Sequence, residues 1–487
     1  MLNLRYCSLR GMGSPCRECH ADELQSNFSK RRFAQTDPWH KPLPIPVHST
    51  LCTHTSLPPE PFFMHASKPT SVASTRGRNL ALLAAFLGWM FDGMEMGIFP
   101  LVAGPGLREM GVQSGLELNT PEMNGYVSFW MGWVTAFFLF GAALGGLTFG
   151  WLGDRIGRIR AMSWSILCYS AFTGLCYFAA EPWQMAALRF IAALGMGGEW
   201  ALGVALVMES WPSKWRSYLA GLIGAAANLG YVLIALIAIY FPVRDDSWRW
   251  VMLIGAAPAI LTFGIRMFVP ESHLWEEAQQ KGPSSPIRDV LSAPILPKTL
   301  LATLFASVAL IVTWGIVQWI PLWADQIALD KNPIRKAELQ LCSSSGAVFG
   351  SLIAPIIGNI IGRRLTYFGM CGLALILCET LFLMVHDFGI GFKIMTIAVG
   401  ASSASFYGWL PLYLPELFPT RARATGQGLA FNFGRIFAGI GALFMPQIMK
   451  AFEGSYPKAG ATIALMYLVG MIAIWFAPET KDKPLPD

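Results

Sequence analysis

Two carboxylates lie inside the first long apolar stretch of the chain. Asp92 and Glu95 stand three residues apart in GWMFDGME (88–95), a spacing that places both on one face of a helix. A charged carboxylate in the middle of an apolar helix costs about 2.5 to 3.5 kcal/mol on membrane-insertion scales, and a pKa raised by about two or three units costs a comparable amount. Reversible proton binding is therefore the chemistry that this pair can do. The alternative is a polar pair that fixes helix packing.

Other charged side chains lie in later apolar stretches. Arg189 and Glu199 share one stretch and Arg435 lies in another, so each should pair or face a polar cavity. The planar guanidinium of Arg435 is a candidate for binding a substrate carboxylate through two parallel hydrogen bonds, or else it holds two helices together. Trp200, next to Glu199, could present an aromatic face to a ring-bearing substrate, or serve as a packing residue or interface anchor.

The elements that must position these residues occur twice. In GWLGDRIGR (150–158) and its shorter second copy NIIGR (359–363), Asp154 aligns with Asn359 and Arg158 with Arg363, 205 residues later. Three further correspondences follow at offsets of 207 or 208: Glu209 with Glu416, Arg216 with Arg423, and Glu271 with Glu479. Parallel halves of about six apolar segments each are typical of transporters.

Composition places the chain in lipid. Hydrophobic residues make up 54% and charged residues only 14%, whereas a soluble protein has about a quarter of its residues charged. The net charge of +6 is dispersed in short loops rather than clustered, which argues against nucleic-acid binding. We therefore expect an all-α membrane protein of twelve transmembrane helices in two pseudo-symmetric six-helix bundles. The predicted spans are 79–103, 122–149, 161–180, 184–209, 217–241, 247–269, 298–321, 338–360, 366–386, 391–416, 426–449 and 459–477.

These spans divide the chain into five parts. We expect a disordered extension over 1–75, bundles over 76–269 and 298–481, a cytoplasmic linker over 270–297 that tethers them or forms a short interfacial helix, and a tail over 482–487. The extension contains Cys16-Arg17-Glu18-Cys19-His20, which matches a haem-attachment pattern and could alternatively hold zinc. The favoured interpretation is that it has no function, so no cofactor or metal is expected.

Short-loop Lys and Arg residues predict the topology. Fifteen lie on one side of the predicted spans and seven on the other, which puts both termini in the cytoplasm and the chain in the plasma (inner) membrane. Charged residues at the cytoplasmic helix ends could latch the two halves together, or be ordinary solvated loop charges. The predicted cytoplasmic gate comprises Asp154, Arg158, Glu209, Arg216, Glu271, Arg363, Glu416, Arg423 and Glu479. Because Asn359 replaces the acid, the second-half latch should be weaker.

The repeated motif, the Pro-Glu-Ser/Thr ends and the two sets of six spans resemble the major facilitator superfamily over about residues 79 to 481. Three stretches resemble the metabolite:proton symporters that carry aromatic acids or sialic acid: 88–95, GMGGEW (195–200) and PELFPTRARATG (415–426). The resemblance implies a proton-coupled carrier of a small organic acid that works by alternating access, in the lipid bilayer and as a monomer. Arg189 stands at the family's arginine position, where it would pair with Asp92 or Glu95.

Two alternatives remain open. A sugar or drug carrier on the same fold would leave Arg435 structural, and a membrane sensor would bind a solute without moving it. An enzyme is not expected, because no nucleophile, base and orienting residue stand at recognisable spacing.

Overall fold

The computed structural model describes residues 75–486 except 119, 244–246, 257–259, 261–263, 265, 281–285 and 329–333. The predicted extension and its Cys16–His20 motif lie outside the described residues. Every regular element in the described part is helical, in agreement with the predicted fold class.

Eight helical stretches in the described part are long and apolar enough to cross a membrane. Seven correspond to single main helices and one to a pair, as follows: α1 (Thr75–Gln113), α2 (Pro121–Ile156), α4 (Pro182–Ser210), α5 (Arg216–Tyr240), α10 (Leu296–Gly315), α12 (Arg335–Ile361), α13 (Arg363–Met384), and α17 (Tyr456–Ala464) with α18 (Met466–Ala473).

Three other predicted spans overlap helices that fall short of that criterion: α3 (Arg158–Leu175), α14 (Ile390–Tyr413) and α15 (Arg423–Leu443). The predicted span 247–269 overlaps α6 (Trp248–Ala256) and includes residues outside the described part. Four short helices complete the set: α8 (His273–Gln280), α9 (Pro286–Val290), α11 (Ile320–Ile327) and α16 (Met445–Ala451).

The boundaries differ from prediction mainly in α1. This helix continues ten residues beyond the predicted end at 103, although it contains Pro100 and Pro105. A proline interrupts one helical hydrogen bond, and in a membrane neighbouring helices compensate for that loss. Trp248 of α6 packs beside the second proline, where a Cβ on Gly106 would lie 3.1 Å from its ring.

A glycine separates α2 from α3, and another separates α12 from α13. Gly157 has φ +108° and Gly362 has φ +98°, a conformation that side chains disfavour. A carboxylate then covers each new helix start: Glu271 accepts from the backbone N–H of Arg158 at 2.8 Å, and Glu479 from that of Arg363 at 3.0 Å. Acidic groups are favourable at helix N-termini because the first N–H groups lack helical partners. We call the end of the bundle that holds Gly157 and Gly362 the motif end, and the other the open end.

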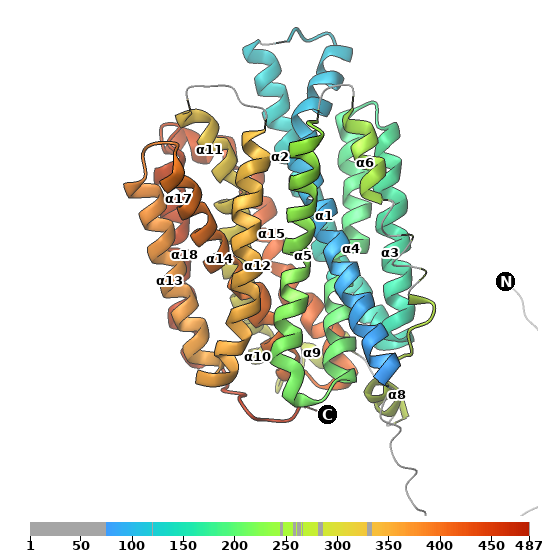
Figure 1. Ribbon diagram of the computed structural model, residues 1–487. Helices are drawn as coiled ribbons and strands as arrows, with labels where there is room; N and C mark the ends of the chain where they lie inside the picture. The colour runs from blue at the N-terminus through green and yellow to red at the C-terminus, as the bar shows by residue number, and fades with distance from the viewer. Residues whose placement is uncertain are drawn as a thin grey trace, which may run out of the picture. The chain divides into compact units, whose positions relative to one another are not determined.

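The two halves meet along two pairs of helices, α2 with α15 and α5 with α12 (Figure 1). At the first crossing a Cβ on Gly146 would lie 2.0 Å from the Asn432 amide nitrogen, and one on Gly428 would lie 2.0 Å from the carbonyl oxygen of Gly146. At the second, a Cβ on Gly221 would lie 2.9 Å from the carbonyl oxygen of Leu352 in α12. Small residues let the helix backbones approach closely, as in membrane helix pairs.

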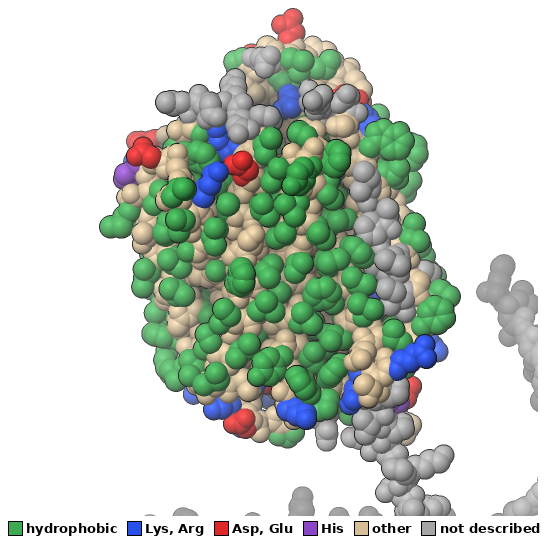
Figure 2. Space-filling model, in the orientation of Figure 1, with side chains coloured by type: hydrophobic (Ala, Val, Ile, Leu, Met, Phe, Trp, Pro, Cys, Tyr) green, Lys and Arg blue, Asp and Glu red, His purple; other side chains and the backbone are tan. Residues whose placement is uncertain are grey.

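The surface matches a membrane setting. Figure 2 shows hydrophobic side chains covering the middle of the visible face, while charged side chains gather toward its two ends. Large apolar residues are exposed along helices that soluble proteins would cover, among them Phe349, Ile376 and Ile394. The predicted lipid-facing class therefore has a direct structural counterpart.

Candidate functional site

A cavity of about 600 Å³ lies between the two halves. Its wall runs from mid-helix residues such as Trp89 and Phe431 to residues at the open end, such as Arg108 near the end of α1 and Lys336 in the first turn of α12. None of the predicted motif-end gate residues lines it. The cavity therefore reaches toward the open end and stops before the motif end.

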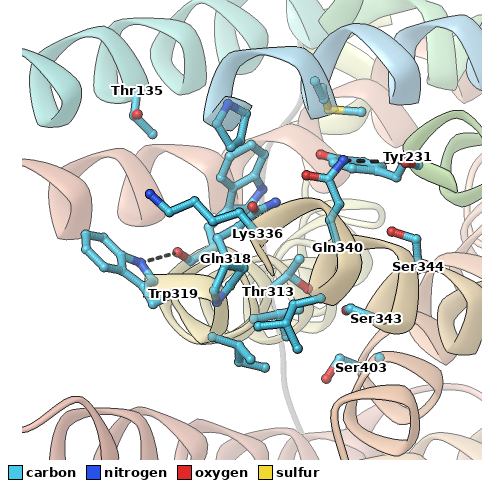
Figure 3. Close-up of a pocket in the computed structure, with 18 of the residues that line it drawn as sticks. Thr135, Tyr231, Thr313, Gln318, Trp319, Lys336, Gln340, Ser343, Ser344 and Ser403 are labelled. Atoms are coloured by element: carbon cyan, nitrogen blue, oxygen red, sulfur yellow. Dashed lines mark hydrogen bonds between the residues drawn. The ribbon is translucent and has the colours of Figure 1, made fainter. Parts of the chain in front are cut away.

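The wall combines aromatic faces with neutral polar groups and basic side chains. Figure 3 shows Gln318, Lys336 and Gln340 around the same space, with Gln340 donating to the carbonyl oxygen of Tyr231 at 3.4 Å. The charged side chains that line the cavity are all basic, Arg108, Lys336 and Arg435, and no described acid joins them. This sign of charge suits an anionic solute.

Arg435 is the mid-helix member of this basic set. It is 3% exposed, its guanidinium lies 5.4 Å from the ring centre of Phe431, and it donates to the Asn432 amide oxygen at 2.6 Å. The Asn432 amide nitrogen donates in turn to the carbonyl oxygen of Gly197 in α4 at 3.0 Å. Asn432 thus holds the guanidinium from one side, and the described part of the chain places no carboxylate in an ion pair with it.

Asp92 is completely buried in α1, and neither of its carboxylate oxygens has a hydrogen-bond partner in the described structure. Its neighbour Gly93 packs so closely on α5 that a Cβ there would lie 2.0 Å from the carbonyl oxygen of Ala227. Asp92 does not line the cavity, but Trp89, one helical turn earlier, does. A buried carboxylate that accepts no hydrogen bond has a high free energy when it is charged, and buried polar groups of this kind are rare in proteins.

Glu95 is also buried, but it has partners. Arg189 forms an ion pair with it, and the Thr173 hydroxyl donates to it at 3.3 Å. The Arg189 guanidinium lies 4.8 Å from the ring centre of Phe99 and 4.6 Å from that of Phe138. Arg189 thus pairs with Glu95 rather than with Asp92, and it does not line the cavity.

Glu199 forms an ion pair with Arg266, a residue that the sequence analysis did not single out. One guanidinium nitrogen of Arg266 lies 3.0 Å from Glu199, and another donates to the carbonyl oxygen of Ala84 at 3.1 Å. A Cβ on Gly88 would lie 2.0 Å from Glu199, so this glycine makes room for the pair. Glu199 therefore has a partner within the first half and no place on the cavity wall. The sequence could have indicated this residue, because Arg266 is a charged side chain inside the predicted span 247–269.

Trp200 lies beneath the cavity rather than on its wall. Its ring stacks on Phe431 at 3.9 Å between centres, and both rings lie within 6.5 Å of Trp89. Phe431 belongs to the second half and the two tryptophans to the first. Of the predicted substrate-binding residues, the structure places only Arg435 on the wall, and Trp200 contacts two rings that line it.

At the motif end, Asp154 joins the two halves. This fully buried carboxylate accepts from the backbone N–H of Thr425 at 2.7 Å and from its hydroxyl at 2.6 Å. Arg423 of the second half lies 3.0 Å from Glu209 of the first, and Arg158 donates to the carbonyl oxygen of Thr420 at 3.0 Å. Charges removed from water and hydrogen-bonded in this way hold the two halves together at this end.

Within each half, the predicted gate residues form a second set of contacts. Arg158 lies 3.1 Å from Glu209, and Arg363 lies 2.7 Å from Glu416. Arg216 is different, because it has no ion-pair partner among the described residues. The structure thus gathers Asp154, Arg158, Glu209 and Arg423 across the halves. The described hydrogen bonds and ion pairs of Glu271, Arg363, Glu416 and Glu479 lie within their own half, and Arg216 of the first half lies near Glu416 of the second without forming an ion pair.

The two carboxylates that cover the helix starts have opposite pKa shifts. Burial raises the pKa of Glu271, and the N–H groups of Ser272, Ile159 and Arg158 offset this only in part. Burial also acts on Glu479, but hydrogen bonds from the backbone N–H groups of four residues outweigh it and lower the pKa of Glu479.

The linker between the halves also contacts the motif end. The Trp275 indole and the Gln279 amide of α8 both donate to the carbonyl oxygen of Asp154, at 3.0 and 2.8 Å.

Known proteins resemble this chain along most of its length. The sialic acid transporter NanX of Escherichia coli is 27% identical over 77% of this chain and 87% of its own, and the cis,cis-muconate transport protein of Acinetobacter baylyi is 26% identical over 86% and 99%. The solved proton:xylose symporter XylE is similar in fold, with a TM-score of 0.68 at 16% identity, over 84% of this chain and 98% of its own.

A family model described as Major Facilitator Superfamily matches residues 80–442, which is most of the chain. Together with the all-helical architecture and its spanning helices, this match defines a multi-pass integral membrane protein whose relatives are transporters rather than enzymes. The chain belongs to the major facilitator superfamily.

Proposed function

We propose that this transporter is a proton-coupled symporter of a small organic acid. The observation that carries the proposal is Asp92, a fully buried carboxylate with no hydrogen-bond partner among the described residues. It lies one helical turn from Trp89 on the wall of a cavity whose mid-helix charge is Arg435. An acid that can lose its charge by binding a proton and a base that can bind a carboxylate are the two functions that such a symporter needs.

The energetics favour reversible protonation in the membrane. A charged carboxylate in the interior of a membrane helix costs about 2.5 to 3.5 kcal/mol on insertion scales, and a bound proton removes that charge. Asp92 gains nothing from hydrogen bonds in this state, whereas Glu95 is compensated by Arg189. Both carboxylates remain our candidates for proton coupling.

The cavity favours an acid with a ring or an extended apolar body. Trp89, Trp314, Tyr407 and Phe431 give it aromatic faces, and Arg435 offers a bidentate donor for a carboxylate. Relatives named for sialic acid and for cis,cis-muconate support an organic acid such as these or an aromatic acid.

The excess of Lys and Arg in the loops of the motif end supports a cytoplasmic location for that end and for both termini in the inner membrane. In this orientation the contacts of Asp154, Glu209 and Arg423 close the cytoplasmic side, while the cavity reaches toward the opposite side. The structure then corresponds to an outward-facing state, and release of solute inside requires these contacts to separate. Alternating access is the rocking of the two halves between these states.

Uptake into proteoliposomes tests the proposal. We expect labelled sialic acid or benzoic acid, but not glucose, to accumulate against its gradient when an inward proton gradient is imposed. Asp92→Asn should abolish accumulation but leave counterflow exchange, because a neutral side chain imitates the protonated state. Equal uptake with and without the proton gradient would refute proton coupling. Glu379→Gln, a carboxylate of α13 away from the cavity, is the matched control and should accumulate solute normally.

One observation favours a second candidate. The wall also carries neutral hydrogen-bonding groups suited to hydroxyl-rich solutes, namely Asn228, Gln318, Gln340, Ser343 and Ser344. A proton:sugar symporter on this fold, as XylE is, would use them and leave Arg435 structural. Accumulation of a neutral hexose that survives Arg435→Gln would favour it.

A further inference from the structure

Asn432 of α15 is a fully buried amide that contacts both halves of the bundle. Its oxygen accepts from a guanidinium nitrogen of Arg435 at 2.6 Å. Its nitrogen donates to the carbonyl oxygen of Gly197 in α4 at 3.0 Å, and to that of Gly428 in α15 at 3.0 Å. A guanidinium can only donate and a carbonyl can only accept, so these partners fix which way the amide points. The amide therefore links the arginine of the cavity wall to a backbone group of the other half.

Two glycines of the first half form the notch that holds this amide. A Cβ on Gly146 of α2 would lie 2.0 Å from the Asn432 amide nitrogen. Gly197 packs on α2 as closely, because a Cβ there would lie 2.0 Å from the carbonyl oxygen of Ala142. A side chain at Gly146 would occupy the place of the amide. The first half is thus shaped to receive the Asn432 side chain.

The first half has no equivalent of the Asn432 and Arg435 pair. The offset of 207 in the repeat places Ala225 at the position of Asn432 and Asn228 at that of Arg435. Helix α5, which carries Ala225 and Asn228, still packs against α12 of the other half. Packing of the halves therefore does not require an amide at this position, and packing alone does not account for the pair.

Asn432 lies between the motif end and the cavity. It follows Arg423, which joins the halves at the motif end, by nine residues, or about 13 Å along α15 at 1.5 Å per residue. Arg435, one turn further on, lines the cavity wall. In the rocking motion proposed above, α15 leaves α2 and α4 when the motif end opens, so the bond from Asn432 to Gly197 breaks with the contacts of Arg423. Asn432 then keeps Arg435 and Gly428 as partners but loses its attachment to the first half.

On the basis of the function proposed above, we propose that Asn432 is a positioning residue, which ties the affinity of Arg435 for a substrate carboxylate to closure of the motif end. With the halves closed, Gly197 holds the amide and the amide holds one edge of the guanidinium. The geometry for two parallel hydrogen bonds to a carboxylate is then ready before the anion arrives. With the motif end open, the amide can turn, so binding of the anion must also order the guanidinium, and the anion binds more weakly in the state that releases it. Because linkage is reciprocal, a bound anion stabilises the closed motif end by the same factor.

A double-mutant cycle tests this coupling in the full-length protein in lipid. The probe is sialic acid, and quenching of the cavity tryptophans measures its Kd. Asn432→Ala and Glu209→Gln should each raise Kd about tenfold, the first by freeing the guanidinium and the second by opening the motif end. The double variant should bind no more weakly than either single variant, because an open motif end has already released the amide. A rise of about a hundredfold in the double variant, or an unchanged Kd in either single variant, would overturn the proposal.

Two controls separate this role from packing. Ser351→Ala removes another buried contact between the halves, since the Ser351 hydroxyl accepts from Asn228 at 3.3 Å, but Ser351 has no described contact with Arg435 and does not line the cavity. It should change Kd less than about twofold, and a rise equal to that of Asn432→Ala would contradict the proposal. In uptake, Asn432→Ala should raise KM about tenfold and keep the maximal rate within about twofold of wild type, whereas damage to packing would lower the maximal rate.

A second variant serves if Asn432→Ala does not fold. Asn432→Ser replaces it in the cycle, because a serine hydroxyl bonds the carbonyl four residues earlier in its own helix and does not reach Gly197. Additive effects in the cycle, together with accumulation of acid driven by the proton gradient, would refute the role of Asn432 and leave the proposed symport standing. A wild-type protein that binds neither sialic acid nor benzoic acid would refute both.

Discussion

The two copies of the repeated motif share one set of contacts and differ in another. In each half an arginine after the hinge glycine contacts a glutamate at the end of the fourth span, Arg158 with Glu209 and Arg363 with Glu416. Only the first copy also crosses to the other half. Asp154 is fully buried against Thr425, whereas its counterpart Asn359 is exposed and Tyr218 stands where the repeat would place a second threonine.

The comparison separates two functions of one motif. Among the motif residues, the shared contacts lie within each half, and only the first copy forms described hydrogen bonds and ion pairs with the other half. The Arg216 and Arg423 positions show the same division, because Arg423 reaches Glu209 across the interface and Arg216 has no described ion-pair partner. In our proposal, the first copy sets how stable the closed motif end is.

The largest expected effect is that of Glu209→Gln. This glutamate accepts from Arg158 and from Arg423 at 3.1 and 3.0 Å, and loss of one partner of a buried ion pair costs about 3 to 5 kcal/mol. If this cost falls on the closed state, the motif end should open at least about 150-fold more readily. Alkylation of a cysteine placed at Ser128, on the cavity wall near the start of α2, should fall accordingly.

Glu416→Gln is the matched variant in the second half. It breaks a pair that lies within that half, so it should lower the thermal unfolding temperature and leave alkylation at position 128 unchanged. Equal effects of both variants on alkylation would contradict the division between the two copies.

Asp154→Asn should have the next largest effect. The asparagine oxygen can still accept from Thr425, but the charge that pairs with Arg158 is lost. Because the closed motif end loses about 1.5 kcal/mol of charge-assisted bonding, its return to the closed state, and with it transport, should be about tenfold slower, with little loss of expression. Initial uptake rates measure this change. The exposed counterpart gives the control, since Asn359→Ala should transport at the wild-type rate; unchanged transport by Asp154→Asn would argue against the latch.

A smaller effect should come from building the missing contact. The double variant Asn359→Asp with Tyr218→Thr supplies the acid and hydroxyl of the first copy at the α5–α12 crossing. One new hydrogen bond of about 1 kcal/mol should slow opening of the motif end about fivefold, with neither single variant sufficient. Counterflow rates of the two single variants and the double variant measure this change in opening. If either single variant slows counterflow as much as the pair, the two positions do not meet.

The smallest effects concern Glu271 and Glu479. The pKa of Glu479 is lowered, so its stabilising contribution is present above the unfolded value of 4.5 and lost as pH falls through its folded pKa. The pKa of Glu271 is raised, so the wild type loses stability as pH rises from 4.5 through its folded pKa. Thermal unfolding followed from below pH 4.5, where Glu479 loses its contribution, up to about pH 7, where Glu271 has lost its own, should therefore show opposite pH trends when wild type is compared with Glu479→Gln and with Glu271→Gln. If the two comparisons gave pH trends of the same sign, the opposite pKa shifts of Glu271 and Glu479 would be refuted.

Much of this protein can be predicted from its sequence. Span positions follow from apolar length, and the doubled architecture follows from the repeat that relates Gly157 to Gly362 and Glu271 to Glu479. The membrane class and the superfamily are confirmed. These features depend on composition and on order along the chain, which a sequence contains directly.

Pairing among the buried charges was decided by tertiary structure. Sequence reasoning placed Glu199 with the substrate and omitted Arg266, and it left Arg189 with two possible partners; the fold joins Glu199 to Arg266 and Arg189 to Glu95. A buried charge requires a partner, but the partner depends on which helix faces meet and on where a residue such as Gly88 leaves room. Residue order shows that several charges must be neutralised, whereas the packing of the helices selects the pairs and leaves Asp92 without one.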